Sequence, residues 1–162
     1  MGRQLCFGVL LLGIISAGCR QSEPVVTYSV DVYDPSRDPA ADLAATVAQA
    51  KSAGKRILLQ VGGDWCSWCH RLDAYIQVQP AVARALGENF ILMKVNYSDE
   101  NHNEAFLSQY PAIPGYPHWF VLDADGKLLH SQDTADLEAG ETYSQPAILM
   151  IVDQWKASAS GA

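Results

Sequence analysis

A pair of cysteines separated by two residues constrains the fold of this chain more than any other feature. Residues 65–70 read Trp-Cys-Ser-Trp-Cys-His and lie between an apolar run at residues 57–61 and a segment at residues 71–78 that is predicted to be helical. The apolar run is typical of a buried strand. Cys66 then lies at a helix N-terminus, where unpaired backbone N–H groups and the helix dipole favour a thiolate. Because the thiolate is the attacking species in disulfide exchange, we predict that Cys66 and Cys69 form a redox dithiol.

The N-terminal segment predicts export from the cytoplasm. An apolar stretch at residues 5–15 follows Arg3, and it is shorter than the ~20 residues that a membrane-spanning helix needs. Residues 16–19 read Ser-Ala-Gly-Cys, which resembles a bacterial lipobox in which Cys19 is lipidated and becomes the mature N-terminus. The alternative is an ordinary cleaved signal peptide. In the lipoprotein interpretation, Cys6 is removed and the mature protein has one dithiol and no structural disulfide.

These signals predict the organisation and location of the chain. We expect a lipoprotein signal peptide at residues 1–18, a lipid-anchor tether and N-terminal strand at residues 19–37, and a folded domain at residues 38–158. The lipobox resemblance brings a sorting rule with it, and Arg20 after the cysteine then favours the outer membrane, with the domain facing the periplasm. An oxidising compartment does not hold thiols reduced by glutathione. A dithiol there either donates disulfides or needs a membrane or periplasmic redox partner.

Charge and length exclude some classes of partner. The chain has a formal net charge of −7 and shows no basic stripe, which argues against a nucleic-acid partner and against electrostatic binding to anionic lipid. We therefore expect membrane association only through the lipid anchor. About 140 residues remain after the signal peptide, which fits one domain with its own core.

Strand and helix signals alternate along the rest of the chain. Asp38-Pro39 is typical of a helix start, Gly54 of a helix end, and Pro80 of a bend or interruption. We predict the following elements: strand 27–32, helix 38–54, strand 57–61, helix 71–78 that resumes at 81–86 after an interruption at Pro80, strand 90–95, helix 104–109, a hairpin of residues 119–122 and 127–130, and a last helix opened by Pro146. The polar residues 133–144 are predicted to form a surface loop. This order indicates an α/β fold with a mixed sheet.

The chain resembles the thioredoxin superfamily, and in particular exported bacterial thioredoxin-like and disulfide-isomerase-like domains. Three features carry the resemblance: the Trp-Cys-x-x-Cys motif at residues 65–69, the strand at residues 57–61 that leads into it, and Gly-Tyr-Pro at residues 115–117 before a buried strand. It covers about residues 38–156. The resemblance implies a thioredoxin-like fold with a central mixed sheet flanked by helices.

The resemblance also implies roles for individual residues. Cys66 would attack a substrate disulfide and Cys69 would resolve the mixed disulfide, while Pro117, with a cis peptide bond, would lie beside the sulfurs. We expect Trp65, Trp68 and Tyr116 to bind substrate, and we expect Trp119, Phe120 and Trp155 to belong to the core. The implied partners are protein disulfides or dithiols, and the implied activity is thiol-disulfide oxidoreduction by a monomer without a cofactor.

Three features depart from the family pattern: Gln60, His118 and the Ser67-Trp68 dipeptide. Gln60 stands where thioredoxins often carry a buried acid, and an amide cannot take a proton from the resolving thiol. Asp64 is near in sequence but is predicted to lie in an exposed loop. His118 follows the proline, where it would either stabilise a nearby thiolate or face solvent at the start of a strand. Because Ser67 and Trp68 replace the Gly-Pro of many thioredoxins, the redox potential and the direction of exchange stay open.

Length favours a reductase over an isomerase, since about 140 residues leave no room for the dimerisation domain that isomerases often use. The main alternative is a c-type haem protein, because Cys66-x-x-Cys69-His70 is also a haem attachment signature. His70 would then be the proximal ligand and Met93, Met150 or His118 the distal one. Against haem, the motif follows a buried strand in an α/β pattern. We expect no metal site, because zinc usually takes four ligands and one cysteine pair remains after processing.

Overall fold

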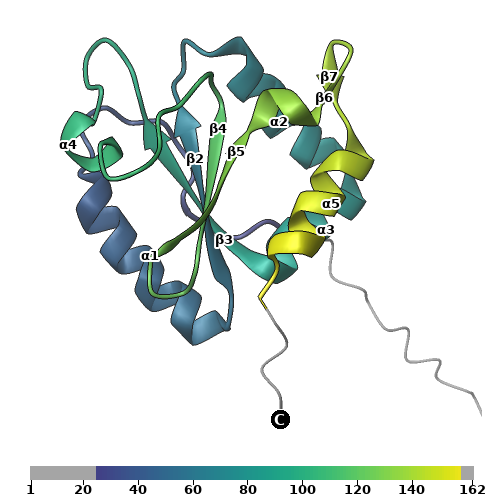
Figure 1. Cartoon of the computed structure of the whole chain (residues 1–162), viewed down its shortest axis with the longest axis horizontal. Helices are drawn as coiled ribbons and strands as arrows, with labels where there is room; N and C mark the ends of the chain where they lie inside the picture. The colour runs from purple at the N-terminus through teal and green to yellow at the C-terminus, as the bar shows by residue number, and fades with distance from the viewer. Residues whose placement is uncertain (1–24, 158–162) are drawn as a thin grey trace, which may run out of the picture.

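A five-stranded mixed sheet forms the centre of the computed structural model, which describes residues 25–157 (Figure 1). The strand order is β1-β3-β2-β4-β5. β1 runs parallel to β3 and β3 to β2, whereas β4 is antiparallel to both β2 and β5. The bounds are β1 Tyr28–Val30, β2 Arg56–Gly62, β3 Phe90–Asn96, β4 His118–Leu122 and β5 Leu128–Asp133. The predicted α/β fold with a mixed sheet is therefore confirmed.

Helices cover both faces of this sheet. In Figure 1, α1 (Pro39–Ala53) and α4 (Glu104–Leu107) lie on one side, and α2 (Ser67–Val78), α3 (Pro80–Asn89) and α5 (Gln145–Trp155) lie on the other. Among residues 25–157, no helix combines the length and the apolar composition needed to cross a membrane.

The predicted helix boundaries are confirmed where a local residue sets them. The Asp38 side chain accepts hydrogen bonds from two backbone amides in the first turn of α1, and Gly54 ends that helix with a left-handed backbone at φ 64°. Pro80 has no N–H to continue the ladder of α2, so α2 ends at Val78 and α3 begins at Pro80 itself.

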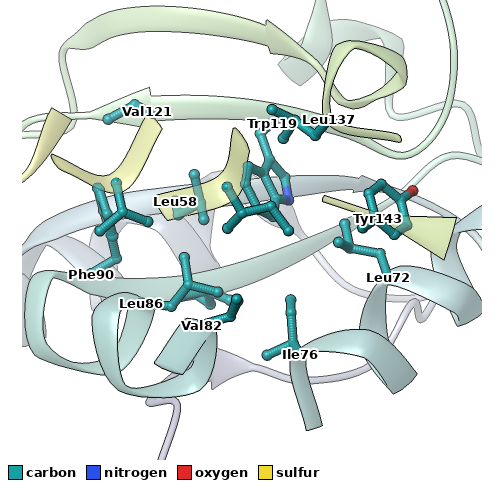
Figure 2. Close-up of a cluster of buried hydrophobic side chains, with 13 residues drawn as sticks. Leu58, Leu72, Ile76, Val82, Leu86, Phe90, Trp119, Val121, Leu137 and Tyr143 are labelled. Carbon is teal, nitrogen blue, oxygen red and sulfur yellow. The ribbon is translucent and has the colours of Figure 1, made fainter. Parts of the chain in front are cut away.

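Two hydrophobic clusters, one on each face of the sheet, form the core. The larger one fills the space between the sheet and α2, α3 and α5, as Figure 2 shows for Leu58, Leu72, Leu86, Phe90 and Trp119. The second lies on the α1 side and contains Phe120. Trp119 and Phe120 are fully buried as expected, whereas Trp155 is only partly buried at the edge of the first cluster. The central strand β2 contributes to both clusters, which is why its sequence is a continuous apolar run.

Residues 133–144 do not form the predicted surface loop. They form a 3-10 helix, η1 (Thr134–Leu137), and a short hairpin of β6 (Glu138–Ala139) and β7 (Thr142–Tyr143). Leu137 and Tyr143 are 2% exposed and belong to the core cluster beside α2. The prediction was wrong because these two inward residues are too far apart in sequence to create a recognisable hydrophobic period.

Candidate active site

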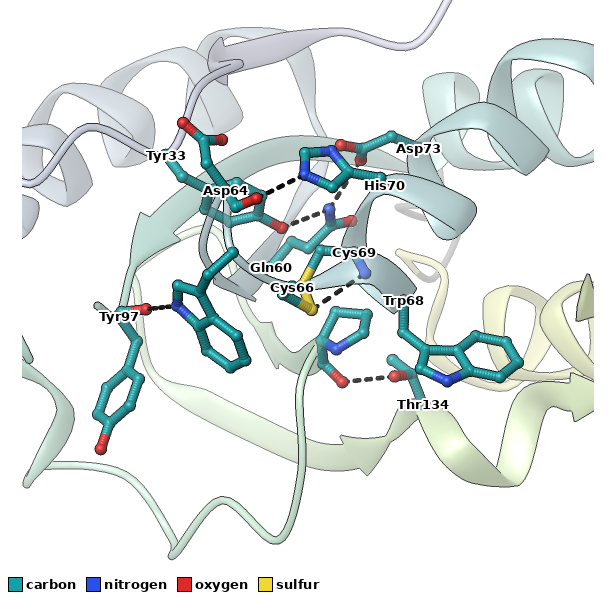
Figure 3. The surroundings of a disulfide bond; sticks show 12 residues. Tyr33, Gln60, Asp64, Cys66, Trp68, Cys69, His70, Asp73, Tyr97 and Thr134 are labelled. Atoms are coloured by element: carbon teal, nitrogen blue, oxygen red, sulfur yellow. Dashed lines mark hydrogen bonds between the residues drawn. A yellow bond between two sulfur atoms is a disulfide. The ribbon is translucent and has the colours of Figure 1, made fainter. Parts of the chain in front are cut away.

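The two cysteines lie at the N-terminus of α2 and form a disulfide, with their Cα atoms 5.2 Å apart (Figure 3). Cys66 is the N-cap residue, and its Sγ accepts a hydrogen bond from the backbone N–H of Cys69 at 3.1 Å. Cys66 is 3% exposed and Cys69 is 0% exposed. A sulfur that occupies the N-cap position is well placed to hold negative charge once the disulfide is reduced, because the first-turn N–H groups and the helix dipole point toward it.

The loop before β4, which contains Tyr116 and Pro117, packs against the cysteines. The Tyr116–Pro117 peptide bond is cis, as the family resemblance implied. Tyr116 packs against a small cluster formed by Tyr33, Cys66 and Cys69. The carbonyl oxygen of Pro117 accepts a hydrogen bond from the Thr134 hydroxyl, so η1 holds this loop in place.

Several aromatic side chains lie beside the nearly buried disulfide. Trp65 is 58% exposed, packs edge-on against Tyr116, and donates its Nε1 hydrogen to the Tyr97 carbonyl at 2.6 Å. Tyr116 stacks on Tyr97, which stacks in turn on His102. Tyr116, Tyr97 and His102 line a hollow of about 490 Å³ that extends toward α4. Trp65 and Tyr116 therefore present apolar surface beside the cysteines.

Trp68 differs from Trp65 because the structure holds it on several sides. It is partly buried, packs edge-on against Tyr143 with ring centroids 5.5 Å apart, and has the Arg71 guanidinium 4.7 Å from its ring centroid. The Tyr143 hydroxyl also donates to the Trp68 carbonyl at 3.3 Å. The structure thus anchors Trp68 to the β7 hairpin and leaves Trp65 as the more accessible of the two.

A buried polar network lies beneath the dithiol and is centred on Gln60. In the sheet, Gln60 pairs with Lys94 on β3 and with Trp119 on β4. Its amide nitrogen donates to the Tyr33 hydroxyl at 2.8 Å and to Asp73 Oδ1 at 2.9 Å, as Figure 3 shows, and its amide oxygen accepts from Trp119 Nε1 at 3.2 Å. Both amide hydrogens and the amide oxygen of this buried side chain therefore have a hydrogen-bond partner.

A largely buried carboxylate, that of Asp73 on α2, bonds to the Gln60 amide. Asp73 lies four residues after Cys69, and its Oδ2 forms an ion pair with Lys94 Nζ at 2.8 Å. Both side chains are largely buried, and the ammonium group also lies 5.1 Å from the centroid of the Tyr33 ring. The sequence contained a signal for this pair, since a single lysine within an apolar strand is rarely buried without a partner.

Sequence reasoning also missed Tyr33, which no motif singled out. It lies in the loop between β1 and α1 and is 5% exposed. Burial raises its pKa far above the ordinary value, so the phenol stays protonated even in strongly alkaline solution.

The remaining polar candidates lie outside the cysteine cluster. Asp64 is exposed as predicted, and its carbonyl oxygen lies 2.7 Å from His70 Nε2. The interpretation of His118 as a solvent-facing residue is wrong, because it is 2% exposed and its Nε2 lies 2.8 Å from Ser131 Oγ. Its ring contacts Phe120 on the α1 side of the sheet, and burial lowers its pKa. Within residues 25–157, no three His, Cys, Asp or Glu side chains gather as they would around a metal ion.

Comparison with known proteins identifies the family. A model of a family described as thioredoxin-like matches residues 38–124. The chain belongs to the thioredoxin-like family. It is 31% identical over 86 residues to the thiol:disulfide interchange protein DsbD of Salmonella paratyphi A, and 28% identical over 80 residues to the disulfide bond reductase DsbH of Chlamydia pneumoniae. These matches cover 53% and 44% of this chain but only 15% of that DsbD and 48% of that DsbH.

Solved structures share the fold. A disulphide isomerase from Xylella fastidiosa Temecula1 superposes with a TM-score of 0.64 and 23% identity, over 76% of this chain and 96% of that one. The oxidised C-terminal domain of Neisseria meningitidis DsbD superposes with a TM-score of 0.56 and 24% identity, over 74% of this chain and 97% of that one. At these identities the likeness establishes the thioredoxin fold of this family member and no particular activity.

Proposed function

We propose that this thioredoxin-like protein is a thiol-disulfide oxidoreductase that exchanges disulfides with protein substrates through Cys66 and Cys69. The observation that carries the proposal is the Cys66–Cys69 disulfide at the N-terminus of α2, with Cys66 in the N-cap position. The names of the DsbD and DsbH relatives support the same reaction class.

In the proposed reaction, the reduced protein acts first through Cys66. Its thiolate attacks one sulfur of a substrate disulfide, which releases the other substrate sulfur as a thiolate and leaves a mixed disulfide on Cys66. Cys69 then loses its proton and attacks the Cys66 sulfur. The second substrate thiolate leaves, and the protein is left in the oxidised form that the structure describes. A reductant of the dithiol class must then regenerate the thiols.

Trapping of the intermediate tests the assignment of the two cysteines. In a Cys69→Ser variant the mixed disulfide cannot be resolved, so a covalent adduct with a disulfide substrate should accumulate on Cys66. The matched control is Cys66→Ser, which should trap little because Cys69 is 0% exposed and lies inside α2, whereas Cys66 caps the helix. Equal trapping by the two variants would reverse or remove the assignment, and no exchange by the unsubstituted protein would overturn the proposed function.

Reduction is the proposed direction of exchange, and the disulfide bond reductase DsbH among the relatives supports it. Equilibration of the dithiol with a glutathione series measures the potential that decides the direction. A value near −270 mV would match a thioredoxin-like reductant, and a value near −120 mV an oxidant. The latter result would contradict the reductase proposal and leave the oxidoreductase proposal standing.

Haem attachment is less favoured by the geometry of the same motif. The two sulfurs are bonded to each other and buried, and His70 Nε2 faces the Asp64 carbonyl at 2.7 Å. An absorption spectrum of the protein purified from its natural compartment tests this point, because a c-type haem gives an intense visible band and a dithiol gives none.

We further propose that the protein is a periplasmic lipoprotein anchored through Cys19, with the outer membrane as its favoured location. Residues 1–24 lie outside the described part of the structure, so this proposal rests on the lipobox resemblance and on Arg20. Residues 20–24 span at most about 18 Å when extended, which keeps the dithiol close to the membrane. Replacement of Cys19 by alanine should move the protein into the soluble periplasmic fraction, and identical fractionation of both forms would exclude the anchor.

A further inference from the structure

The side chain of Tyr33 reaches the resolving cysteine through a gap left by a glycine. Tyr33 forms one buried cluster with Cys66 and Cys69. A Cβ atom added to Gly62 would collide with the Cys69 sulfur and would lie 3.1 Å from the Tyr33 hydroxyl oxygen. The sulfur and the hydroxyl therefore border the same small space, which stays open because residue 62 has no side chain.

The hydrogen of the Tyr33 hydroxyl has no role in the polar network beneath the site. The Trp119 indole can only donate, and the Asp73 carboxylate can only accept, so together they fix the orientation of the Gln60 amide. The amide nitrogen then donates one hydrogen to Asp73 and the other to the Tyr33 oxygen. Since Tyr33 accepts from Gln60, its own hydrogen is available to a different acceptor.

We propose that the Tyr33 hydroxyl donates a hydrogen bond to the Cys69 sulfur when the disulfide opens, and so stabilises the thiolate that resolves the mixed disulfide. This inference rests on the proposed exchange reaction and adds a residue to it. Before resolution, Cys69 is a thiol and its proton leaves to solvent. The resulting thiolate keeps the Tyr33 hydrogen bond until it attacks Cys66, forms the new S–S bond and expels the substrate thiolate. Tyr33 itself neither gains nor loses a proton over the cycle.

Other charged groups around Cys69 remain unchanged when only the Tyr33 hydroxyl is removed. Asp73 and His70 lie on α2, Lys94 on β3, Asp64 in the loop before α2, and His118 on β4. Asp73 and Lys94 neutralise each other as an ion pair. A change in the titration of Cys69 on substitution of Tyr33 by phenylalanine is therefore assigned to the lost hydroxyl.

The pKa of Cys69 provides the direct test and needs no substrate. In a Cys66→Ala background, the ¹³Cβ resonance of Cys69 is followed as the pH is raised, with and without Tyr33→Phe. A hydrogen bond to a charged group is worth enough to shift the pKa by about one unit, so Tyr33→Phe should raise the pKa of Cys69 by about that amount. The matched control is Tyr28→Phe, which removes a hydroxyl from a tyrosine that also lies near Lys94, 5.7 Å from its ring centroid, but outside the cysteine cluster.

Kinetics give a second readout in the protein with both cysteines. Tyr33→Phe should slow resolution of the mixed disulfide about threefold at pH 7, because the roughly tenfold loss of Cys69 thiolate is partly offset by the greater nucleophilicity of a thiolate with a higher pKa. Above both Cys69 pKa values the variant should no longer be the slower of the two. If Tyr33→Phe does not fold, the Tyr33 ¹³Cζ resonance of the unsubstituted protein should still shift between its oxidised and reduced forms, while that of Tyr28 stays fixed. Equal Cys69 pKa values in the two tyrosine variants, or an unshifted Tyr33 resonance, would overturn the inference. If Tyr33→Phe raises the pKa of Cys69 as expected but the unsubstituted protein exchanges no disulfides, the inference stands and the proposed function is overturned.

Discussion

Replacement of Gln60 by leucine should destabilise the oxidised protein by about 3 kcal/mol. The two side chains are similar in size, so the change mainly removes the amide group at the centre of the buried network. Trp119 Nε1 then loses the acceptor that it has at 3.2 Å, and Asp73 loses one donor at 2.9 Å. A buried donor left without a partner costs about 1–3 kcal/mol, and a hydrogen bond to a charged group contributes about 1.5–3 kcal/mol.

Two effects reduce the sum of these costs. Asp73 keeps Lys94 as its ion-pair partner, and the freed Tyr33 hydroxyl can reorient toward the carboxylate. Leucine also avoids the cost of burying an amide. The net loss of stability should therefore lie near the lower end of these summed costs, at about 3 kcal/mol. It should exceed the effect of an ordinary exposed substitution, which is about 0.5 kcal/mol or less.

Guanidinium unfolding of the oxidised protein at pH 7 measures the effect. Trp119→Phe is the matched variant, because it removes the indole N–H and leaves Gln60 in place. If the Gln60–Trp119 hydrogen bond matters, the double variant should lose less stability than the sum of the single losses. A Gln60→Leu protein as stable as the unsubstituted one would refute the reasoning, since the network would then contribute no net stability.

Three further substitutions test other parts of the structure. Gly62→Ala should cost about 1–3 kcal/mol of stability through its collision with Cys69, whereas Gly115→Ala, whose Cβ would have no neighbour within 4 Å, serves as the silent control. Leu86→Ala should cost about 2–5 kcal/mol in the same unfolding assay, because the side chain is fully buried. Burial lowers the pKa of His118, so the unfolded chain binds its proton more readily. Stability should then fall as the pH drops below about 6.5, and His118→Phe should flatten that slope; an unchanged slope would contradict it.

The fold could be predicted from the sequence at several places where a short-range signal sets the structure, although the predicted strand 27–32 is only Tyr28–Val30 and the helix predicted to end at residue 86 runs to Asn89. The apolar run at residues 57–61 became the central strand, Asp38 and Gly54 became the caps of α1, and Pro80 separated α2 from α3. Each of these features depends on one residue or one period, so it acts before any tertiary contact forms. Residues 133–144 lacked such a signal, and their polar composition concealed the buried Leu137 and Tyr143.

The site divides in the same way between local and long-range features. The motif itself placed Cys66 at the N-terminus of a helix, and the family resemblance implied the cis bond before Pro117, both of which the structure contains. The network beneath them could not be predicted, because the partners of Gln60 lie 13, 27 and 59 residues away along the chain. The pairing of β2 with β4, the packing of α2 on the sheet and the path of the loop between β1 and α1 together bring these side chains to Gln60.

Asp73 and Tyr33 both bond to Gln60 but would influence the dithiol over different ranges. Asp73 and Lys94 carry opposite charges 2.8 Å apart, so their fields largely cancel at distances greater than their separation. The Tyr33 hydroxyl is uncharged, but Tyr33 lies in the same buried cluster as Cys69, and the proposed hydrogen bond would join the hydroxyl and the sulfur directly. A direct hydrogen bond to a thiolate outweighs the residual field of a compensated ion pair. The ion pair therefore fixes the position of Gln60, Gln60 orients Tyr33, and Tyr33 is the member of the network that reaches the reacting sulfur.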